Sequence, residues 1–134
     1  MNILFVCRFN MTRSRIAEAY FKKVNKNKNI KVKSAGLIKG DPVFKEDIKL
    51  AKKFGLDIRG RVKGISRRFL KWQTLTIIVA DDVPPQIFDV NLTYGMKLLV
   101  WKIKDTKYHK NKDDLVKDIM KKVDGLVKKL EKEK

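Results

Sequence analysis

The chain has 134 residues, 43% of them hydrophobic, so it can bury a core without disulfides or a structural metal. We expect a single domain over residues 1–134. Its net charge is +18 and it has one cysteine, which excludes an internal disulfide and gives no indication of secretion. No apolar run approaches the length that spans a bilayer, so we expect no membrane partner. We also expect the protein to be cytoplasmic and monomeric.

The first half of the chain predicts strands and helices in alternation. Residues 2–6 form a continuous apolar run, typical of a strand buried on both faces, and helical spacing begins at Ser14. A second strand is predicted over 30–34. The Asp-Pro pair at 41–42 is typical of a helix start, and Gly55 is typical of its end because glycine readily adopts the left-handed turn.

The second half predicts two more strands and a long final helix. Between 59 and 73 the pattern is weak, and we expect a loop with a short helix near 67–71. Strands are predicted over 74–80 and 98–103, and a helix over 113–130. This order predicts an α/β protein with three α/β/α layers and a four-stranded parallel sheet. Such sheets bind ligands beyond the carboxyl ends of their strands.

The segment between the first strand and the first helix contains the candidate chemistry. Cys7 ends the strand, and five residues separate it from Arg13. Backbone amides of such a loop, with the N-terminal end of the next helix, form an anion site that also favours the thiolate form of cysteine. The planar guanidinium of arginine can bind two oxygens of one phosphoryl group. We therefore predict a phosphate-binding loop between the first strand and the first helix, with Cys7 as nucleophile.

The sequence resembles a known family over essentially its whole length. The run VCRFNMTRSRIAE at 6–18, SAG at 34–36, GLD at 55–57 and AD at 80–81 are similar to low-molecular-weight protein tyrosine phosphatases, in the superfamily that includes arsenate-reductase-like cysteine phosphatases. The resemblance implies hydrolysis of phosphate monoesters, phosphotyrosine by default, through a phosphocysteine intermediate. The partner would be a phosphorylated protein or a small phosphate monoester, and phosphoarginine remains a possible substrate. No cofactor or metal is implied.

The resemblance also implies roles for single residues. Cys7 would attack phosphorus, and Arg13 with the loop amides would bind the phosphoryl oxygens. Ser14 would donate a hydrogen bond to the sulfur, and Asn10 would hold a left-handed turn. Asp105, just past the fourth strand, would be the general acid. The other predicted phosphate-loop and substrate-binding residues are Arg8, Phe9, Met11, Thr12 and Tyr108. Tyr108 would be an aromatic wall of the site, or else an ordinary surface tyrosine.

Four residues depart from the family pattern. Phe9 stands where a glycine is usual, Arg15 and Thr106 replace prolines, and Thr12 replaces a second cysteine found in many members. None of these changes removes a catalytic group. They concern the rate and the substrate more than the chemistry.

Several alternatives remain open from the sequence. Asp81 or Asp82, after the third strand, is the alternative acid. A phosphocysteine phosphocarrier would need no acid, and a basic phosphate- or nucleic-acid-binding module would not catalyse. A thioredoxin-coupled arsenate reductase needs further cysteines, so the single cysteine argues against it.

The large positive charge has two interpretations. It could attract anionic ligands, or it could reflect the Lys- and Glu-rich surface that is common in hyperthermophiles. The lysines are scattered and no arginine-rich stripe is present, so we expect no stable nucleic-acid partner. Trp72 and Trp101 are predicted to be packing residues. His109, the only histidine, is predicted to lie at the surface.

Overall fold

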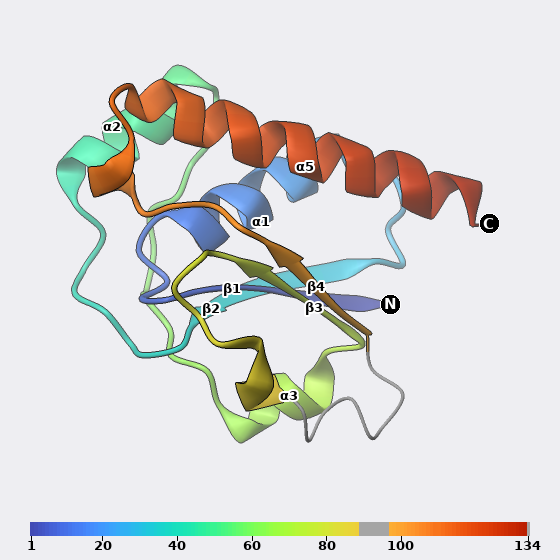
Figure 1. Cartoon of the computed structure of the whole chain (residues 1–134). Helices are drawn as coiled ribbons and strands as arrows, with labels where there is room; N and C mark the ends of the chain where they lie inside the picture. The colour runs from blue at the N-terminus through green and yellow to red at the C-terminus, as the bar shows by residue number, and fades with distance from the viewer. Residues whose placement is uncertain (89–96, 134) are drawn as a thin grey trace.

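The computed structural model describes residues 1–88 and 97–133 and has the predicted three-layer α/β/α architecture (Figure 1). All strand pairs are parallel and the strand order is β2-β1-β3-β4. The strands are β1 (Asn2–Cys7), β2 (Lys31–Gly36), β3 (Leu75–Val79) and β4 (Lys97–Trp101). The α-helices are α1 (Arg13–Val24), α2 (Lys45–Lys53), α3 (Arg67–Trp72) and α5 (Lys112–Lys132), and the 3-10 helices are η1 (Pro85–Phe88) and η2 (Thr106–Tyr108).

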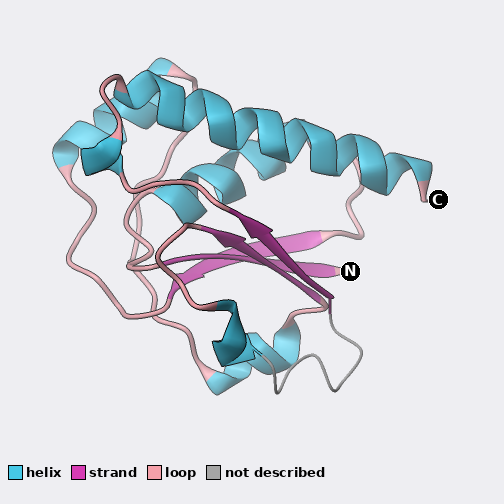
Figure 2. Cartoon of the chain, viewed as in Figure 1, coloured by secondary structure: helices cyan, strands magenta, loops and turns pink. Residues whose placement is uncertain are grey.

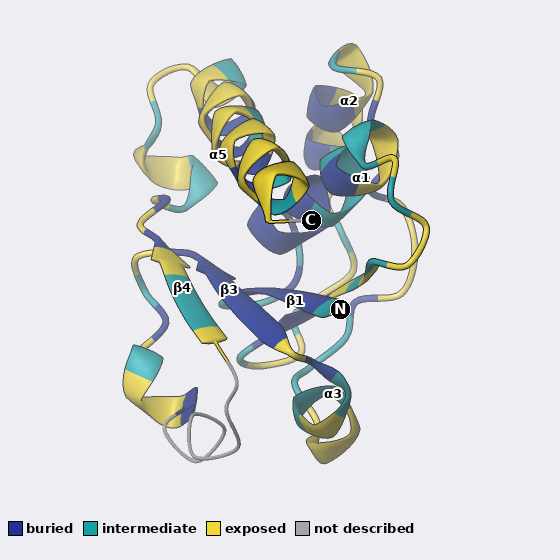
Figure 3. Cartoon of the chain, turned by 90° about the vertical axis from the view of Figure 1, so that its right-hand side faces the viewer, coloured by how far each residue is buried: buried dark blue, intermediate teal, exposed yellow. Residues whose placement is uncertain are grey.

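Helices cover both faces of the sheet (Figures 1 and 2). On one face, Phe5 and Ile77 pack with α1, α2 and α5 in the larger core cluster. On the other, Val6 and Ile78 pack with Phe88 and α3. The central strands are therefore buried on both sides, whereas α5 exposes its outer face (Figure 3). No helix in the described part of the chain is long and apolar enough to cross a membrane.

Helix α2 begins at Lys45, so the predicted start at 41–42 is wrong. The chain after β2 first runs along the phosphate loop, where backbone N–H groups of residues 37, 38 and 40 donate to the carbonyl oxygens of residues 7, 8 and 9 at 2.9, 2.9 and 3.2 Å. Those tertiary hydrogen bonds hold residues 37–40 against the loop, and the chain bends at 37–38 and at 41–42 before α2 begins. The end of α2 is as predicted: Gly55 has φ 74°, and the N–H of Leu56 returns to the carbonyl of Ala51.

Strand β4 is shorter than predicted because the chain turns after Trp101. The N–H of Ile103 donates to the carbonyl of Trp101 at 2.8 Å, and the carbonyl of Ile103 accepts from the N–H of Asp81 at 3.1 Å. Trp101 packs in the core, with its ring 5.9 Å from that of Phe5, as predicted. Trp72 packs beside the second cluster, also as predicted.

Gly36 fixes how closely the end of β2 approaches the phosphate loop. A Cβ added at Gly36 would lie 2.6 Å from backbone atoms of Phe9, Asn10 and Ile38. We expect Gly36→Ala to lower the free energy of unfolding by roughly 2–3 kcal/mol, because backbone must shift to relieve the overlap. Urea denaturation measures this loss.

The matched control for that variant is Gly125 in α5, where an added Cβ would meet nothing within 4 Å. Gly125→Ala should raise the free energy of unfolding by about 1 kcal/mol, since alanine favours the helix. A Gly36→Ala protein as stable as the wild type would show that the loop tolerates a wider spacing.

Candidate active site

A cavity of about 480 Å³ opens at the carboxyl edge of the sheet, where the phosphate loop joins β1 to α1. The loop contributes Cys7, Phe9, Met11, Thr12 and Arg13 to its lining. Residues 39–47, after β2, and 105–107, after β4, line the rest. The parallel topology thus brings three distant segments to one site, as expected for the carboxyl ends of such strands.

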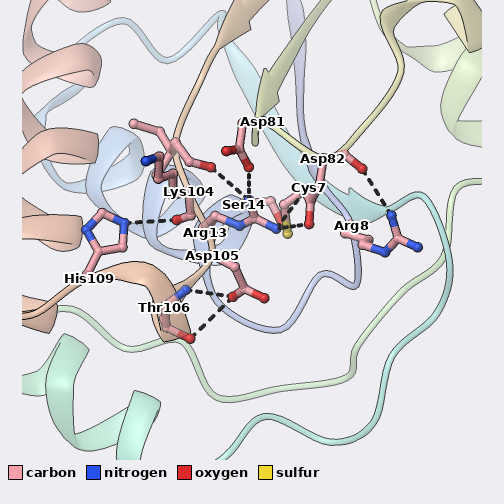
Figure 4. Close-up of polar contacts among 11 residues, drawn as sticks. Cys7, Arg8, Arg13, Ser14, Asp81, Asp82, Lys104, Asp105, Thr106 and His109 are labelled. Atoms are coloured by element: carbon pink, nitrogen blue, oxygen red, sulfur yellow. Dashed lines mark hydrogen bonds and ion pairs between the residues drawn. The ribbon is translucent and has the colours of Figure 1, made fainter.

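The sulfur of Cys7 is buried and lies 3.1 Å from Ser14 Oγ (Figure 4). Ser14 Oγ accepts a hydrogen bond from Asn10 Nδ2 at 2.9 Å. Because that bond uses the oxygen as acceptor, the hydroxyl hydrogen of Ser14 remains for the sulfur. A hydrogen bond in this direction favours a thiolate.

Asn10 holds the turn of the loop. Its φ is 57°, the only positive φ of a non-glycine residue in the described part of the chain. Its buried carboxamide donates from Nδ2 to Ser14 and to Ser34 Oγ at 3.0 Å. Its Oδ1 accepts from the backbone N–H of Lys63 at 2.9 Å and from Arg15 Nη1 at 3.3 Å. Four hydrogen bonds therefore fix this side chain.

Arg13 lines the cavity with an almost fully buried side chain. Its Nη1 donates to the carbonyl of Ile103 at 2.8 Å, and its Nη2 donates to Asp82 Oδ1 and Oδ2 at 2.9 and 3.2 Å (Figure 4). Asp81 Oδ1 lies 3.8 Å from Nη1. Both candidate acids after β3 are thus ion-paired with this guanidinium and hold it at the cavity.

Asp105 also lines this cavity and lies at the start of η2 (Figure 4). Its Oδ1 accepts hydrogen bonds from the N–H of Thr106 at 2.7 Å and from Thr106 Oγ1 at 3.3 Å. Proline, usual in the family at 106, has no N–H, so this departure adds contacts to the carboxyl.

His109 lies at the surface, as predicted, and is half-buried there. Its Nε2 lies 3.0 Å from the carbonyl oxygen of Lys104 (Figure 4). This contact closes the turn at residues 104–109, which contains Asp105. Nothing in the sequence signals this contact, because it depends on the turn that follows β4.

A second cavity, of about 580 Å³, lies beside the first and shares Phe9, Asp105 and Lys107 with it. Arg8 and Tyr108 line this second cavity and not the one that contains Cys7. The Arg8 guanidinium lies 5.5 Å from the ring centroid of Phe9 and donates to the Asp82 carbonyl. Tyr108 is 66% exposed. Their predicted contact with substrate would therefore be at the edge of the site.

Several residues at the first cavity escaped sequence analysis, among them Lys39, Gly40 and Lys107. Phe44 lines it while 54% exposed, although its sequence position suggests a core residue. Asp41 and Asp47 also line it, and the buried Asp47 accepts from Thr12 Oγ1 at 2.8 Å. That bond fastens the start of α1 to α2. The described residues contain no group of three His, Cys, Asp or Glu side chains that could hold a metal ion.

Two cationic side chains lie behind the loop, outside the first cavity. Arg15 is buried, and burial lowers the pKa of its guanidinium. Burial likewise lowers the pKa of Lys63, which is half-buried beside it. Glu18 raises both pKa values and so offsets part of that cost.

The sequence matches the model of one protein family over residues 2–134, so the chain belongs to the low molecular weight phosphotyrosine protein phosphatases. Comparison with curated proteins gives no match. Among solved structures, the YwlE arginine phosphatase from Geobacillus stearothermophilus is similar, at 20% identity and a TM-score of 0.81 over 98% of this chain and 94% of that one.

Two further structures show the range of proteins that share the fold. SP-PTP, the low molecular weight protein tyrosine phosphatase from Streptococcus pyogenes, is 16% identical with a TM-score of 0.81, over 96% of this chain and 92% of that one. The arsenate reductase from Archaeoglobus fulgidus is 23% identical with a TM-score of 0.71, over 93% and 98%. The fold therefore occurs both in phosphatases and in an arsenate reductase.

Proposed function

We propose that this protein hydrolyses phosphate monoesters through a phosphocysteine intermediate on Cys7. One observation carries the proposal: the buried Cys7, the Arg13 guanidinium and the Asp105 carboxyl all line one cavity. These are the nucleophile, the oxyanion ligand and the proton donor that phosphoryl transfer through cysteine requires. The Cys7 sulfur also lies within hydrogen-bond distance of the Ser14 hydroxyl.

The loop backbone supports binding of the phosphoryl group. The carbonyl groups of residues 7, 8 and 9 accept hydrogen bonds from residues 37–40, so they are turned toward that segment. In a trans peptide, the N–H of the next residue points opposite to the carbonyl. The N–H groups of residues 8, 9 and 10 therefore point away from 37–40 and are available to an anion together with the Arg13 guanidinium.

The reaction then proceeds in two steps. The Cys7 thiolate attacks phosphorus, the phosphorus–oxygen bond to the leaving group breaks, and Asp105 supplies the proton that the leaving oxygen needs. Water then attacks the phosphocysteine and gives its proton to Asp105, which releases phosphate and restores the thiolate. Asp105 Oδ1 accepts both hydrogen bonds from Thr106, so Oδ2 is the oxygen that would carry the proton.

Phosphotyrosine is the substrate that the cavity lining favours. Phe9, Met11 and Phe44 present apolar surface around Cys7, which an aromatic leaving group can cover. Asp41 and Asp47 also line the cavity and could attract a guanidinium, so phosphoarginine is the second candidate. A panel of phosphotyrosine, phosphoserine and phosphoarginine, with Cys7→Ser as the blank, distinguishes them.

Particular residues separate two other activities from hydrolysis. A thioredoxin-coupled arsenate reductase needs further cysteines to resolve its intermediate, and this sequence has only Cys7. A phosphocarrier needs no acid, so a role for Asp105 in turnover separates it from a hydrolase.

Asp105→Asn tests the mechanism. We expect it to slow hydrolysis of phosphotyrosine by about 10²–10⁴-fold, the usual range for acid–base assistance. The loss should shrink as the leaving group becomes more acidic, because an acidic phenol leaves without a proton. Initial rates with a series of substituted phenyl phosphates measure this dependence.

The matched control is Asp41→Asn, another carboxyl in the lining of the same cavity, which should show no dependence on the leaving group. Asp81→Asn is the second control. If the dependence follows Asp81 instead, the acid lies at the end of β3. If none of the three variants, Asp105→Asn included, shows it, a phosphocarrier or a binding module is the better interpretation.

A further inference from the structure

The mechanism above does not use the guanidinium of Arg15, although this charge is 7% exposed and lies directly behind the phosphate loop. It donates to three neutral oxygens: the Ile58 carbonyl at 2.8 Å, the Arg61 carbonyl at 3.0 Å and Asn10 Oδ1 at 3.3 Å. Burying a charge against neutral acceptors has a free-energy cost. A site that retains such a charge is a candidate for a functional role.

The contact with Asn10 determines which way its carboxamide faces. Oδ1 meets the Arg15 guanidinium and the N–H of Lys63, and both groups can only donate. Nδ2 must then face Ser14 and Ser34. The oxygen and nitrogen of this amide are thus assigned by its neighbours.

The orientation of Asn10 propagates to the hydroxyl groups on its other side. Ser34 accepts from Asn10 and donates its own hydrogen to Glu18 Oε1 at 2.6 Å. Ser14 likewise accepts from Asn10, which leaves its hydrogen for the Cys7 sulfur at 3.1 Å. A reversed carboxamide would present an acceptor to Ser14 and draw that hydrogen away from sulfur.

We propose that Arg15 is a positioning residue: through Asn10 it directs the Ser14 hydroxyl onto the sulfur of Cys7, and through the Ile58 and Arg61 carbonyls it fastens the phosphate loop to the segment behind it. A proline at this position, usual in the family, could make none of these three hydrogen bonds. Arg15 itself lies outside the cavity that contains Cys7 and touches no substrate.

Alkylation of Cys7 tests the proposal without relying on turnover. Iodoacetamide is neutral, so the charge of the variant does not alter the approach of the reagent, and the rate constant for its reaction at fixed pH follows the thiolate. Arg15→Lys keeps the charge that acts on Cys7, so comparing it with Arg15→Met separates that charge from the hydrogen bonds. We expect Arg15→Met, which keeps the aliphatic length, to lower that rate constant roughly tenfold, the loss expected for one hydrogen bond from a charged donor. In steady-state kinetics with an aryl phosphate, kcat should fall similarly while KM changes little.

The matched control is Arg59→Met. Arg59 belongs to the same segment, but its side chain is 72% exposed and pairs only with Asp57 among the described contacts. Alkylation of this variant should proceed at the wild-type rate. If Arg15→Met fails to fold, Arg15→Lys replaces it, because lysine keeps the charge but cannot reproduce the three-way contact.

A double-mutant cycle asks whether Arg15 acts through Asn10. If it does, adding Arg15→Met to Asn10→Ala should change the alkylation rate no further, because the effects of coupled residues are not additive. Independent effects that multiply would overturn the proposal, and so would wild-type alkylation of both Arg15 variants. Only the kcat measurement rests on the proposed function, because alkylation of Cys7 needs no turnover. A wild-type protein that hydrolyses no phosphate ester would refute that function and leave the alkylation result to decide on Arg15.

Discussion

Cys7→Ser is expected to lower the rate of aryl phosphate hydrolysis by roughly 10⁴-fold or more, because loss of the nucleophile removes the chemical step itself. A serine hydroxyl is not ionised near neutral pH and is a much weaker nucleophile than a thiolate. Steady-state assays of the two proteins with the same aryl phosphate measure the loss.

Phosphate binding provides the control for this variant. Arg13 and the loop backbone are unchanged in Cys7→Ser, so titration calorimetry should still detect inorganic phosphate. In the wild type, iodoacetate should alkylate Cys7 rapidly, and phosphate should protect it. Wild-type turnover by Cys7→Ser would rule out a covalent mechanism at this residue.

Arg13→Lys should lower kcat/KM by about 10²–10³-fold, the usual cost of removing one ligand of a developing oxyanion. Lysine keeps the charge but replaces a planar fork with a point charge. It cannot contact Asp82 and the Ile103 carbonyl together, as the Arg13 guanidinium does, and still face two phosphoryl oxygens. Steady-state kinetics with an aryl phosphate measure the loss.

Arg8→Lys is the control for Arg13→Lys. Arg8 belongs to the same loop, but its guanidinium lies over Phe9 and outside the cavity that contains Cys7. We expect less than a roughly tenfold loss from this change, since no ligand of the phosphoryl group is removed. Near-normal kinetics of Arg13→Lys, combined with a large loss in Arg8→Lys, would identify Arg8 as the phosphate ligand instead.

The sheet and the position of the loop could be predicted because they depend on local patterns. Continuous apolar runs specify strands buried on both faces, and the spacing of Cys7 and Arg13 specifies a loop at a strand end. The start of α2 could not be predicted, because the residues just before it, 37–40, are hydrogen-bonded to residues 7–9, which lie far away in the sequence. A tertiary contact of this kind leaves no trace in the local sequence.

The contacts around the loop were also beyond sequence analysis. Arg15 and Thr106 differ from the family's prolines, and the sequence alone presents them as losses. The structure shows that both residues donate hydrogen bonds that proline cannot make. Arg15 donates to Asn10 and to the segment at 58–61, and Thr106 donates to Asp105. The partners of Arg15 lie up to 46 residues away, so only the folded chain reveals them.

The contacts of Arg13 have a consequence for the thermodynamics of binding. An arginine side chain that becomes fixed on meeting a ligand loses rotamer freedom worth up to about 2 kcal/mol. In this protein, Asp82 and the Ile103 carbonyl already restrict the side chain, so that loss of conformational entropy belongs to folding and not to association. Asp82 and the Ile103 carbonyl thus allow a small anion to meet a side chain whose conformational entropy was already lost on folding.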